Sequence, residues 1–378
     1  MGITSSKQQS SASLLTPCME GNLNEVKRLV GIHIANISNG KSSLSTYINS
    51  TDAAGNAAIH GAVFAGHLDI LKFLVESCSS TDDENDTTTS NNNGINLQLK
   101  NGLGCTPLWI AAGYNQIDCL EYLLHQLYNA NQLEKALLDA NSTGDTPFIA
   151  AVSKGNIEAV KCLLKVANEK CTYKSYTPEK YMRCNLLRTT NNSDDTPLKV
   201  AVATNQSEEL IELLLKEDEI CQEFLFNNAD EEFASVQSTC INQKNQAGLS
   251  PLIVACERNL PSIVELLLKH DAKYIKDNKG RSPLAVASFC GCDDVVDYLL
   301  NRTDPSTLGL NCVDDNECTP LWLAARTGNR KMVKVLVEAG ADATITDKDG
   351  LSPQDVASKF KKDKVEEYFT QMGSTLSS

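Results

Sequence analysis

One seven-residue segment decides the fold: Thr106-Pro107-Leu108-Trp109-Ile110-Ala111-Ala112. A hydroxyl residue, a proline and, in most copies, a leucine return in the same order along the chain, and alanine or another small residue often follows. The clearest further copies begin at Thr146, Thr196, Ser250, Ser282, Thr319 and Ser352. Two degenerate copies precede the quoted one, around Ser13 and from Ala57 to His60. Nine copies in one chain predict a repeat protein rather than a set of unrelated domains.

Each copy is followed by the pattern of two short helices. The Thr or Ser can cap the first helix, and the proline occupies its first turn, where a missing N–H costs nothing. Eight residues after the proline position stands Gly or Asn, which tolerates positive φ at a helix end: Gly21, Gly66, Asn115, Gly155, Asn205, Asn259, Gly291 and Gly328. Only the ninth copy departs, with Lys361. A second apolar block with helical spacing comes next, as in residues 332–337.

The repeated unit resembles the ankyrin repeat, whose unit of about 33 residues carries a Thr-Pro-Leu-His-x-Ala core. The resemblance implies an all-α fold, an ankyrin-repeat solenoid of helix-turn-helix units joined by β-turn fingers. We expect an N-terminal tail at 1–9, a single array over 10–370 and a tail at 371–378. The nine units are predicted at 10–47, 48–96, 97–137, 138–185, 186–240, 241–273, 274–309, 310–343 and 344–370.

Insertions lengthen the first five units, and all of them fall between the second helix and the next turn. The segment 77–96 is almost entirely Ser, Thr, Asp and Asn, which predicts a loop. Residues 132–137 and 221–226 contain apolar side chains and predict added or extended helices.

Composition restricts the class of function. The net charge of −14 is poorly suited to binding a phosphate backbone, so we expect no nucleic-acid partner. No run reaches the ~18 to 20 apolar residues of a membrane-spanning helix. Fourteen cysteines without a secretory signal are typical of reduced thiols, which favours a cytoplasmic protein.

Residue types that carry chemistry are present without a catalytic arrangement. The five histidines show no metal or triad spacing, and His60 and His67 occupy positions that predict structural roles. Trp109 and Trp322 stand where the family has its histidine, which favours core bracing over ligand contact. Residues 35–42 match a loose phosphate-binding loop, but a predicted helix and not a strand precedes them. We therefore expect no enzyme activity, no metal and no cofactor.

Two segments suggest modification. Met1-Gly2-Ile3-Thr4-Ser5-Ser6 fits the pattern for N-myristoylation of Gly2, and a single acyl chain would give weak, reversible membrane association. Ser79, Ser80 and Thr81 directly precede three acidic residues. Phosphorylation by an acid-directed kinase and an unmodified polar loop both remain open for this run.

The resemblance implies a non-enzymatic scaffold or adaptor, expected to be monomeric, that binds a protein partner along the concave face. The alternative is a substrate-receptor or regulatory subunit of a larger enzyme complex. By analogy with the family, contacts come from turn tips and from the residues just before the helix break. The candidate partner-binding residues are Phe64, Tyr114, Arg258, Lys279, Arg281, Phe289, Arg326 and Lys348. They predict a partner with an acidic segment and apolar side chains, unless the charges merely solvate the surface.

Overall fold

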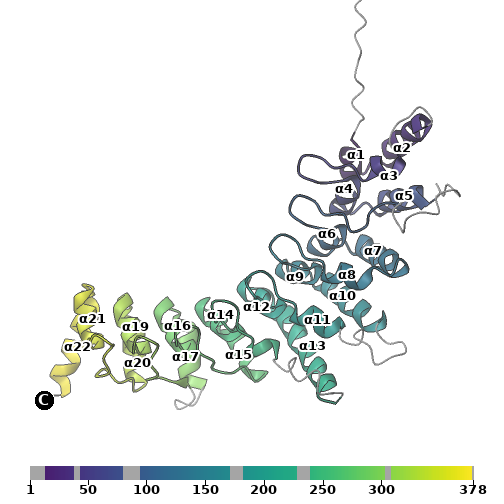
Figure 1. Ribbon diagram of the computed structural model, residues 1–378. Helices are drawn as coiled ribbons and strands as arrows, with labels where there is room; N and C mark the ends of the chain where they lie inside the picture. Colours follow the sequence, from purple (N-terminus) through teal and green to yellow (C-terminus); the bar gives the residue numbers. More distant parts are fainter. Residues whose placement is uncertain are drawn as a thin grey trace, which may run out of the picture. The chain divides into compact units, whose positions relative to one another are not determined.

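The computed structural model describes residues 13–37, 43–79, 94–170, 182–227, 239–302 and 308–376. Over these ranges the chain forms α-helices, a short 3-10 helix and no β-strand, which confirms the predicted all-α repeat fold. It divides into two compact units, Met1–Asn192 and Ser193–Ser378 (Figure 1). The repeat pattern predicted one continuous array and gave no signal for this division. Gly2, Ser80 and Thr81 lie outside the described residues, as does the side chain of Ser79.

Two rows of helices build the first unit. The first helices of its repeats pack on one another in sequence: α1 (Leu15–Met19), α4 (Ala58–Ala65), α6 (Pro107–Gly113) and α9 (Pro147–Ser153). The second helices form the other row: α2 (Leu23–Ile37), α5 (Leu68–Ser79), α7 (Ile117–Asn129) and α10 (Ile157–Lys170). Each repeat therefore buries its apolar face mainly against its neighbours, as expected for a solenoid.

The second unit has the same two rows. Its first helices are α12 (Pro197–Ala203), α14 (Pro251–Glu257), α16 (Pro283–Cys290), α19 (Pro320–Thr327) and α21 (Pro353–Lys359). Its second helices are α13 (Glu208–Asn227), α15 (Pro261–Lys269), α17 (Asp293–Arg302), α20 (Arg330–Glu338) and α22 (Asp363–Leu376). Consecutive first helices pack together, and so do consecutive second helices.

The hydroxyl side chains predicted to cap the first helices do so. In seven repeats the side chain accepts a hydrogen bond from the backbone N–H three residues on: Thr106, Thr146, Thr196, Ser250, Ser282, Thr319 and Ser352. Ala57 has no such group. In this repeat the cap bond runs from the backbone of the capping residue to a side chain of the helix: the backbone N–H of Ala57 donates to Nδ1 of His60 at 3.0 Å.

The predicted helix breaks all adopt positive φ. The eight Gly and Asn residues have φ between 53° at Asn205 and 85° at Gly328. Lys361 has φ of 53° as well, so the ninth repeat keeps the conformation with a residue that rarely adopts it. The break is thus imposed by the packing of the two helices and not by the residue type alone.

In several repeats the residue after the break bonds to the repeat before it. The side chain of Gln116 donates to the carbonyl of Phe64 at 3.0 Å, and that of Asn156 donates to the carbonyl of Gly113 at 2.9 Å. Nε2 of His67 contacts the carbonyl of Met19 at 3.3 Å in the same way. These bonds satisfy carbonyls at the end of a helix. They confirm a structural role for His67.

The insertions add helices. They are α3 (Leu44–Ile48), α8 (Leu133–Leu138), α11 (Met182–Arg188) and the 3-10 helix η3 (Cys240–Asn242), while α13 extends to Asn227. The added helix at 132–137 and the extended helix at 221–226 are therefore confirmed. Several predicted unit boundaries fall inside such helices: 47/48 in α3, 137/138 in α8, 185/186 in α11 and 240/241 in η3, and 370/371 falls inside α22. The repeat register marks turns and carries no signal for a helix between repeats.

Candidate partner-binding surfaces

The fourth position of the repeated motif braces the next repeat. Nε1 of Trp109 donates to the carbonyl of Asp145 at 3.0 Å, and Nε1 of Trp322 donates to that of Leu351 at 3.1 Å. Nε2 of His60 lies 2.9 Å from the carbonyl of Leu99. Because Nδ1 of His60 accepts from the backbone, Nε2 carries the proton and donates. Burial lowers the pKa of His60, so the ring stays neutral. The prediction of core bracing at this position is confirmed.

Lys199 holds this position in the repeat that begins at Thr196. Its side chain is fully buried, with Nζ donating to the carbonyl of Asp194 at 3.3 Å and lying 3.6 Å from a carboxylate oxygen of Asp195. Burial lowers the pKa of Lys199, and the neighbouring Asp195 opposes that shift. A buried lysine here was not anticipated from the sequence.

A groove of about 540 Å³ opens along the first three repeats of the first unit. Its walls come from the helices α1, α4 and α6 and from the turns that precede α4, α6 and α9. Leu15 and Met19 of α1 close one side against Gly61 of α4. A Cβ atom at position 61 would lie 2.8 Å from side-chain atoms of both, so glycine allows this close approach.

The apolar part of the groove is unusually exposed. Phe64 is 41% exposed, Tyr114 50% and Leu103 67%. The rings of Phe64 and Tyr114 meet edge to face, with centroids 4.6 Å apart. The structure thus brings together two predicted binding residues from different repeats. Large apolar side chains are usually buried, so the exposed pair makes this groove a candidate binding surface.

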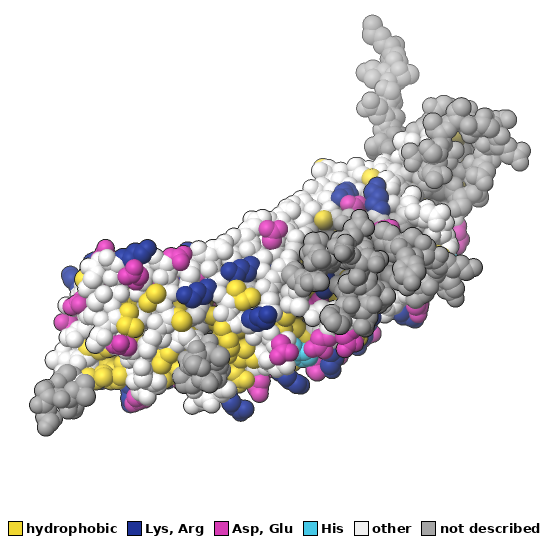
Figure 2. All heavy atoms as spheres, turned by 60° about the horizontal axis from the view of Figure 1, so that its bottom comes forward, with side chains coloured by type: hydrophobic (Ala, Val, Ile, Leu, Met, Phe, Trp, Pro, Cys, Tyr) yellow, Lys and Arg dark blue, Asp and Glu magenta, His cyan; other side chains and the backbone are white. Residues whose placement is uncertain are grey.

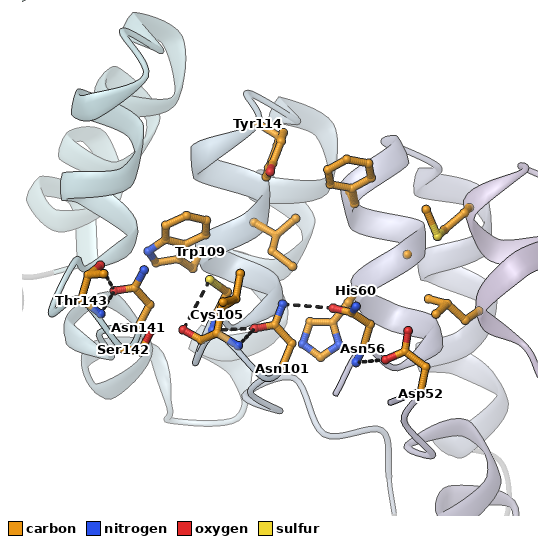
Figure 3. Close-up of a pocket in the computed structure, with 16 residues that line it drawn as sticks. Asp52, Asn56, His60, Asn101, Cys105, Trp109, Tyr114, Asn141, Ser142 and Thr143 are labelled. Carbon is orange, nitrogen blue, oxygen red and sulfur yellow. Dashed lines mark hydrogen bonds between the residues drawn. The ribbon is translucent and has the colours of Figure 1, made fainter. Parts of the chain in front are cut away.

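The other edge of the groove is polar and fixed by hydrogen bonds (Figure 3). Asn101 donates from Nδ2 to the side chain of Asn56 at 3.0 Å, and its Oδ1 accepts from the backbone N–H of Leu103 and Cys105. Asn141 makes the equivalent turn by accepting from Thr143 and Asp145. In Figure 3 these turn residues line one side of the view, and Tyr114 lies on the other. The side-chain oxygens of Asn101 and Asn141 are therefore engaged within their own turns.

The predicted residues of the second unit differ in how their charges are satisfied. Arg281 is bonded to Asp277, with Nε to Oδ2 at 2.8 Å and a second nitrogen at 2.7 Å. Its guanidinium also lies 5.9 Å from the ring centroid of Phe289. The guanidinium carbon of Arg326 lies near two rings, 5.8 Å from the centroid of Trp322 and 5.4 Å from that of Phe360. Over the described ranges, no carboxylate forms an ion pair with Arg326.

Arg258, Lys279 and Lys348 are exposed, and none of them is ion-paired within the described part of the chain. Two acidic residues stand beside them: Asp349 follows Lys348 in sequence, and the backbone N–H of Asp315 donates to the carbonyl of Lys279 at 3.0 Å. Figure 2 shows basic and acidic side chains interspersed on one side of the second unit, with hydrophobic side chains between them. The surface is mixed in charge, and it is not a uniformly basic field.

The sequence did not identify Met19 and Phe360 as candidate partner-binding residues, although their side chains are 46% and 45% exposed. Phe360 stands directly before the break residue Lys361, as Tyr114 stands before Asn115, so its position could have identified it. The absence of Gly or Asn at position 361 obscured that register. Met19 carries no comparable signal, because the first copy of the motif is degenerate.

The described residues offer little for catalysis. Burial raises the pKa of the Cys119 and Cys162 thiols to about 11 and that of Cys18 to about 12, so these thiols are protonated near neutral pH. No group of three or more His, Cys, Asp or Glu side chains comes together within the described ranges to hold a metal ion.

Paired short helices, capped by Thr-Pro or Ser-Pro and stacked through bracing side chains, define an α-helical repeat solenoid. The family model of ankyrin repeats (3 copies) matches residues 14–135, 84–175, 127–224 and 216–309. The model of ankyrin repeats (many copies) matches residues 306–357. This protein belongs to the ankyrin repeat family, whose repeats generally mediate protein–protein interaction.

Curated relatives share the repeats within much longer chains. Human transient receptor potential cation channel subfamily A member 1 is 27% identical over 239 residues, which is 62% of this chain and 18% of the channel. The ankyrin repeat protein nuc-2 of Neurospora crassa is 36% identical over 102 residues, 27% of this chain and 9% of that protein. The tyrosine-protein kinase HTK16 of Hydra vulgaris is 30% identical over 137 residues, 36% of this chain and 18% of the kinase. The chain thus spans less than a fifth of each of these relatives.

In the parts of the chain that the structure describes, none of the helices has the length and apolar character needed to cross a membrane.

Proposed function

We propose that this protein is a non-enzymatic scaffold or adaptor that binds a partner protein along the concave ankyrin face. The observation that carries the proposal is the exposed Phe64–Tyr114 pair over the groove of the first unit. Aromatic side chains dominate interface energies when a partner covers them. The hydrogen-bonded edge formed by Asn101 and Asn141 supports the same proposal, because a rigid surface loses little entropy on binding.

The two units contribute different chemistry to this proposal. In the first unit, Phe64 and Tyr114 would contact apolar side chains of the partner. In the second unit the proposed contacts come from four exposed cations, an exposed ring and the half-buried Arg281: Arg258, Lys279, Arg326, Lys348, Phe289 and Arg281. An acidic segment of the partner would complement these cations.

Tyr114 and Tyr128 make a matched pair for the test. Tyr128 is the same residue type at 44% exposure, but it belongs to the second helix α7 and does not line the groove. Replacing each in turn by a photoreactive phenylalanine, benzoylphenylalanine, places the same probe on and off the proposed face. We expect irradiation in the protein's own cells to crosslink a discrete partner from position 114 and not from position 128.

Tyr114→Ala should also reduce capture of that partner about tenfold or more, whereas Tyr128→Ala should leave capture unchanged. Equal crosslinking from both positions, or equal capture by both alanine variants, would remove the groove as the binding surface. The second helices would then become the candidate.

A second function, as substrate-receptor or regulatory subunit of a larger complex, is favoured by one observation. In the relatives, the matched repeats form a minor part of proteins whose names include a channel and a tyrosine kinase. Under this proposal the partner crosslinked from position 114 would be an enzyme subunit or its substrate.

Further proposals concern the ends and inserts of the chain. We propose a cytoplasmic, monomeric protein with myristate on Gly2 and weak membrane association through that chain. Phosphorylation of Ser79, Ser80 or Thr81 remains a hypothesis of the same kind. Intact-mass measurement of protein from its own cells tests both modifications.

A further inference from the structure

We propose that Arg326 is the anchor of the second unit for a carboxylate side chain of the partner, and that Arg281 is not. The inference rests on the proposed function, because it names the chemistry by which a partner protein is held there. Sequence alone places both arginines on equivalent surfaces. Their contacts separate them.

Arg281 already has its carboxylate. Asp277 is 6% exposed, and one of its oxygens binds the Arg281 guanidinium while the other accepts the backbone N–H groups of Lys279 and Arg281. This pair belongs to the turn before α16. A partner carboxylate would have to compete with a neighbour that two backbone hydrogen bonds hold in place and that already binds the guanidinium through two nitrogens, so Arg281 offers little charge for recognition.

Arg326 is held in position without being neutralised. The buried ring of Trp322, 5% exposed, and the exposed ring of Phe360 both lie within 6 Å of the guanidinium carbon, a distance typical of cation–π contacts. Contacts with aromatic rings do not provide acceptors for the N–H groups of the guanidinium in the way a carboxylate does, so its N–H edge can still bind a planar acceptor. A carboxylate can take two parallel N–H bonds from such an edge.

The surroundings favour an anion at this place. The side chain of Lys362 lies against Gly328 at the end of α19, and Lys359 and Lys361 are exposed. The turn aspartates before α19 and α21 are engaged elsewhere: Oδ1 of Asp314 accepts from Asn316 and Cys318, and Oδ1 of Asp347 accepts from Asp349 and Leu351. Arg326 lies in the last turn of α19, and the partial negative charge at that helix end balances only part of the positive charge of its side chain. We expect a carboxylate of the partner to balance the rest.

The test uses the full chain with 15N-labelled arginine. The chain has eight arginines, so their Nε–H signals can be resolved, and Arg326→Gln and Arg281→Gln assign the two of interest. The probe is a capped hexaglutamate peptide, with a capped hexaglutamine peptide as the uncharged control. We expect saturable shifts of the Arg326 signal with hexaglutamate only, while the Arg281 signal stays fixed.

Variants sharpen the assignment. Arg326→Lys keeps the charge but loses the planar fork, and it should weaken hexaglutamate binding about tenfold. Phe360→Ala keeps the charge and removes one ring, so it should weaken binding severalfold, and Phe360→Tyr should restore it. Arg281→Gln should bind as the wild type does. The spectrum of the other arginines shows that each variant remains folded.

Three results would overturn the inference: a saturable shift of Arg281 in place of Arg326, equal responses to hexaglutamate and hexaglutamine, or no response to hexaglutamate at all. The two proposals fail separately. Crosslinking from Tyr114 without any hexaglutamate response removes the anchor and keeps the scaffold function. A response at Arg326 without a crosslinked partner keeps the carboxylate anchor and removes the groove of the first unit as the binding surface.

Discussion

The first unit fills the spaces between its repeats with added helices, whereas the second is built almost entirely from the repeats themselves. In the first unit, α3, α8 and α11 pack on neighbouring second helices and bury Ile48, Leu137 and Leu187 at 1%, 1% and 3% exposure. In the second unit, the short η3 buries Cys240 and Ile241 against α12 and α14. The comparison teaches that an insertion can be part of the core, because buried apolar area offsets the modest entropy of a longer connection.

The turns differ as well. In the first unit, Asn101 and Asn191 begin their turns and donate from Nδ2 to side chains of the preceding repeat. The last three turns begin with Asp277, Asp314 and Asp347, which have no such donor. Backbone bonds join neighbouring turn tips in both units, as between the N–H of Ser142 and the carbonyl of Leu103 at 3.0 Å and between the N–H of Lys348 and the carbonyl of Asn316 at 3.1 Å. Asn245 donates in the same way in the second unit, so the contrast concerns its last three turns, where a carboxylate oxygen accepts the backbone N–H groups of the turn.

The largest expected effect tests the added helices. Leu137→Ala should lower the free energy of unfolding of the first unit by about 2–4 kcal/mol, because it opens a cavity beneath α8. Leu103→Ala makes the same chemical change at a side chain that is 67% exposed, and it should cost less than about 1 kcal/mol. Urea denaturation followed by hydrogen exchange in residues 94–170 measures both. Equal and small losses would show that the insertion is a passive loop.

A smaller effect tests the amide connections. Asn191→Asp places a second carboxylate where Nδ2 now donates to Asp145 at 3.2 Å, and it should destabilise the first unit by about 1–3 kcal/mol. Asn245→Asp makes the same change beside Asp195, 2.9 Å away, where the buried Lys199 also contacts that carboxylate. The cost there should be lower, since Lys199 offsets part of the repulsion. Thermal unfolding at neutral pH measures the loss of stability in both variants. A larger loss for Asn245→Asp than for Asn191→Asp would contradict this account.

The smallest effect concerns Lys199 and depends on pH. Because the folded state lowers the pKa of Lys199, its charge costs free energy at neutral pH. That cost disappears as the pH rises through the lowered pKa and above the unfolded value of about 10.4. Lys199→Met should therefore match or exceed the wild type at pH 7, by up to about 1 kcal/mol. The difference should shrink toward pH 10 in urea denaturation, and a difference that grows with pH would refute the assignment.

Local sequence determined the repeated elements. Thr or Ser before proline specified the capped first helices, and Gly or Asn specified the breaks, because capping and positive φ depend on a few neighbouring atoms. The bracing roles of His60, Trp109 and Trp322 followed from their position in the motif. For the candidate site, the register also placed Phe64 and Tyr114 on one surface, since consecutive repeats stack.

Only the tertiary structure decided which of these residues act together. The edge-to-face contact of Phe64 and Tyr114, the pairing of Arg281 with Asp277 and the closeness of Arg326 to both Trp322 and Phe360 each depend on distances that the folded chain sets. The division at Asn192 and the positive φ of Lys361 likewise carry no local signal. Sequence patterns report what one turn of backbone prefers, and whether a charge is neutralised depends on side chains that the fold brings within a few ångströms.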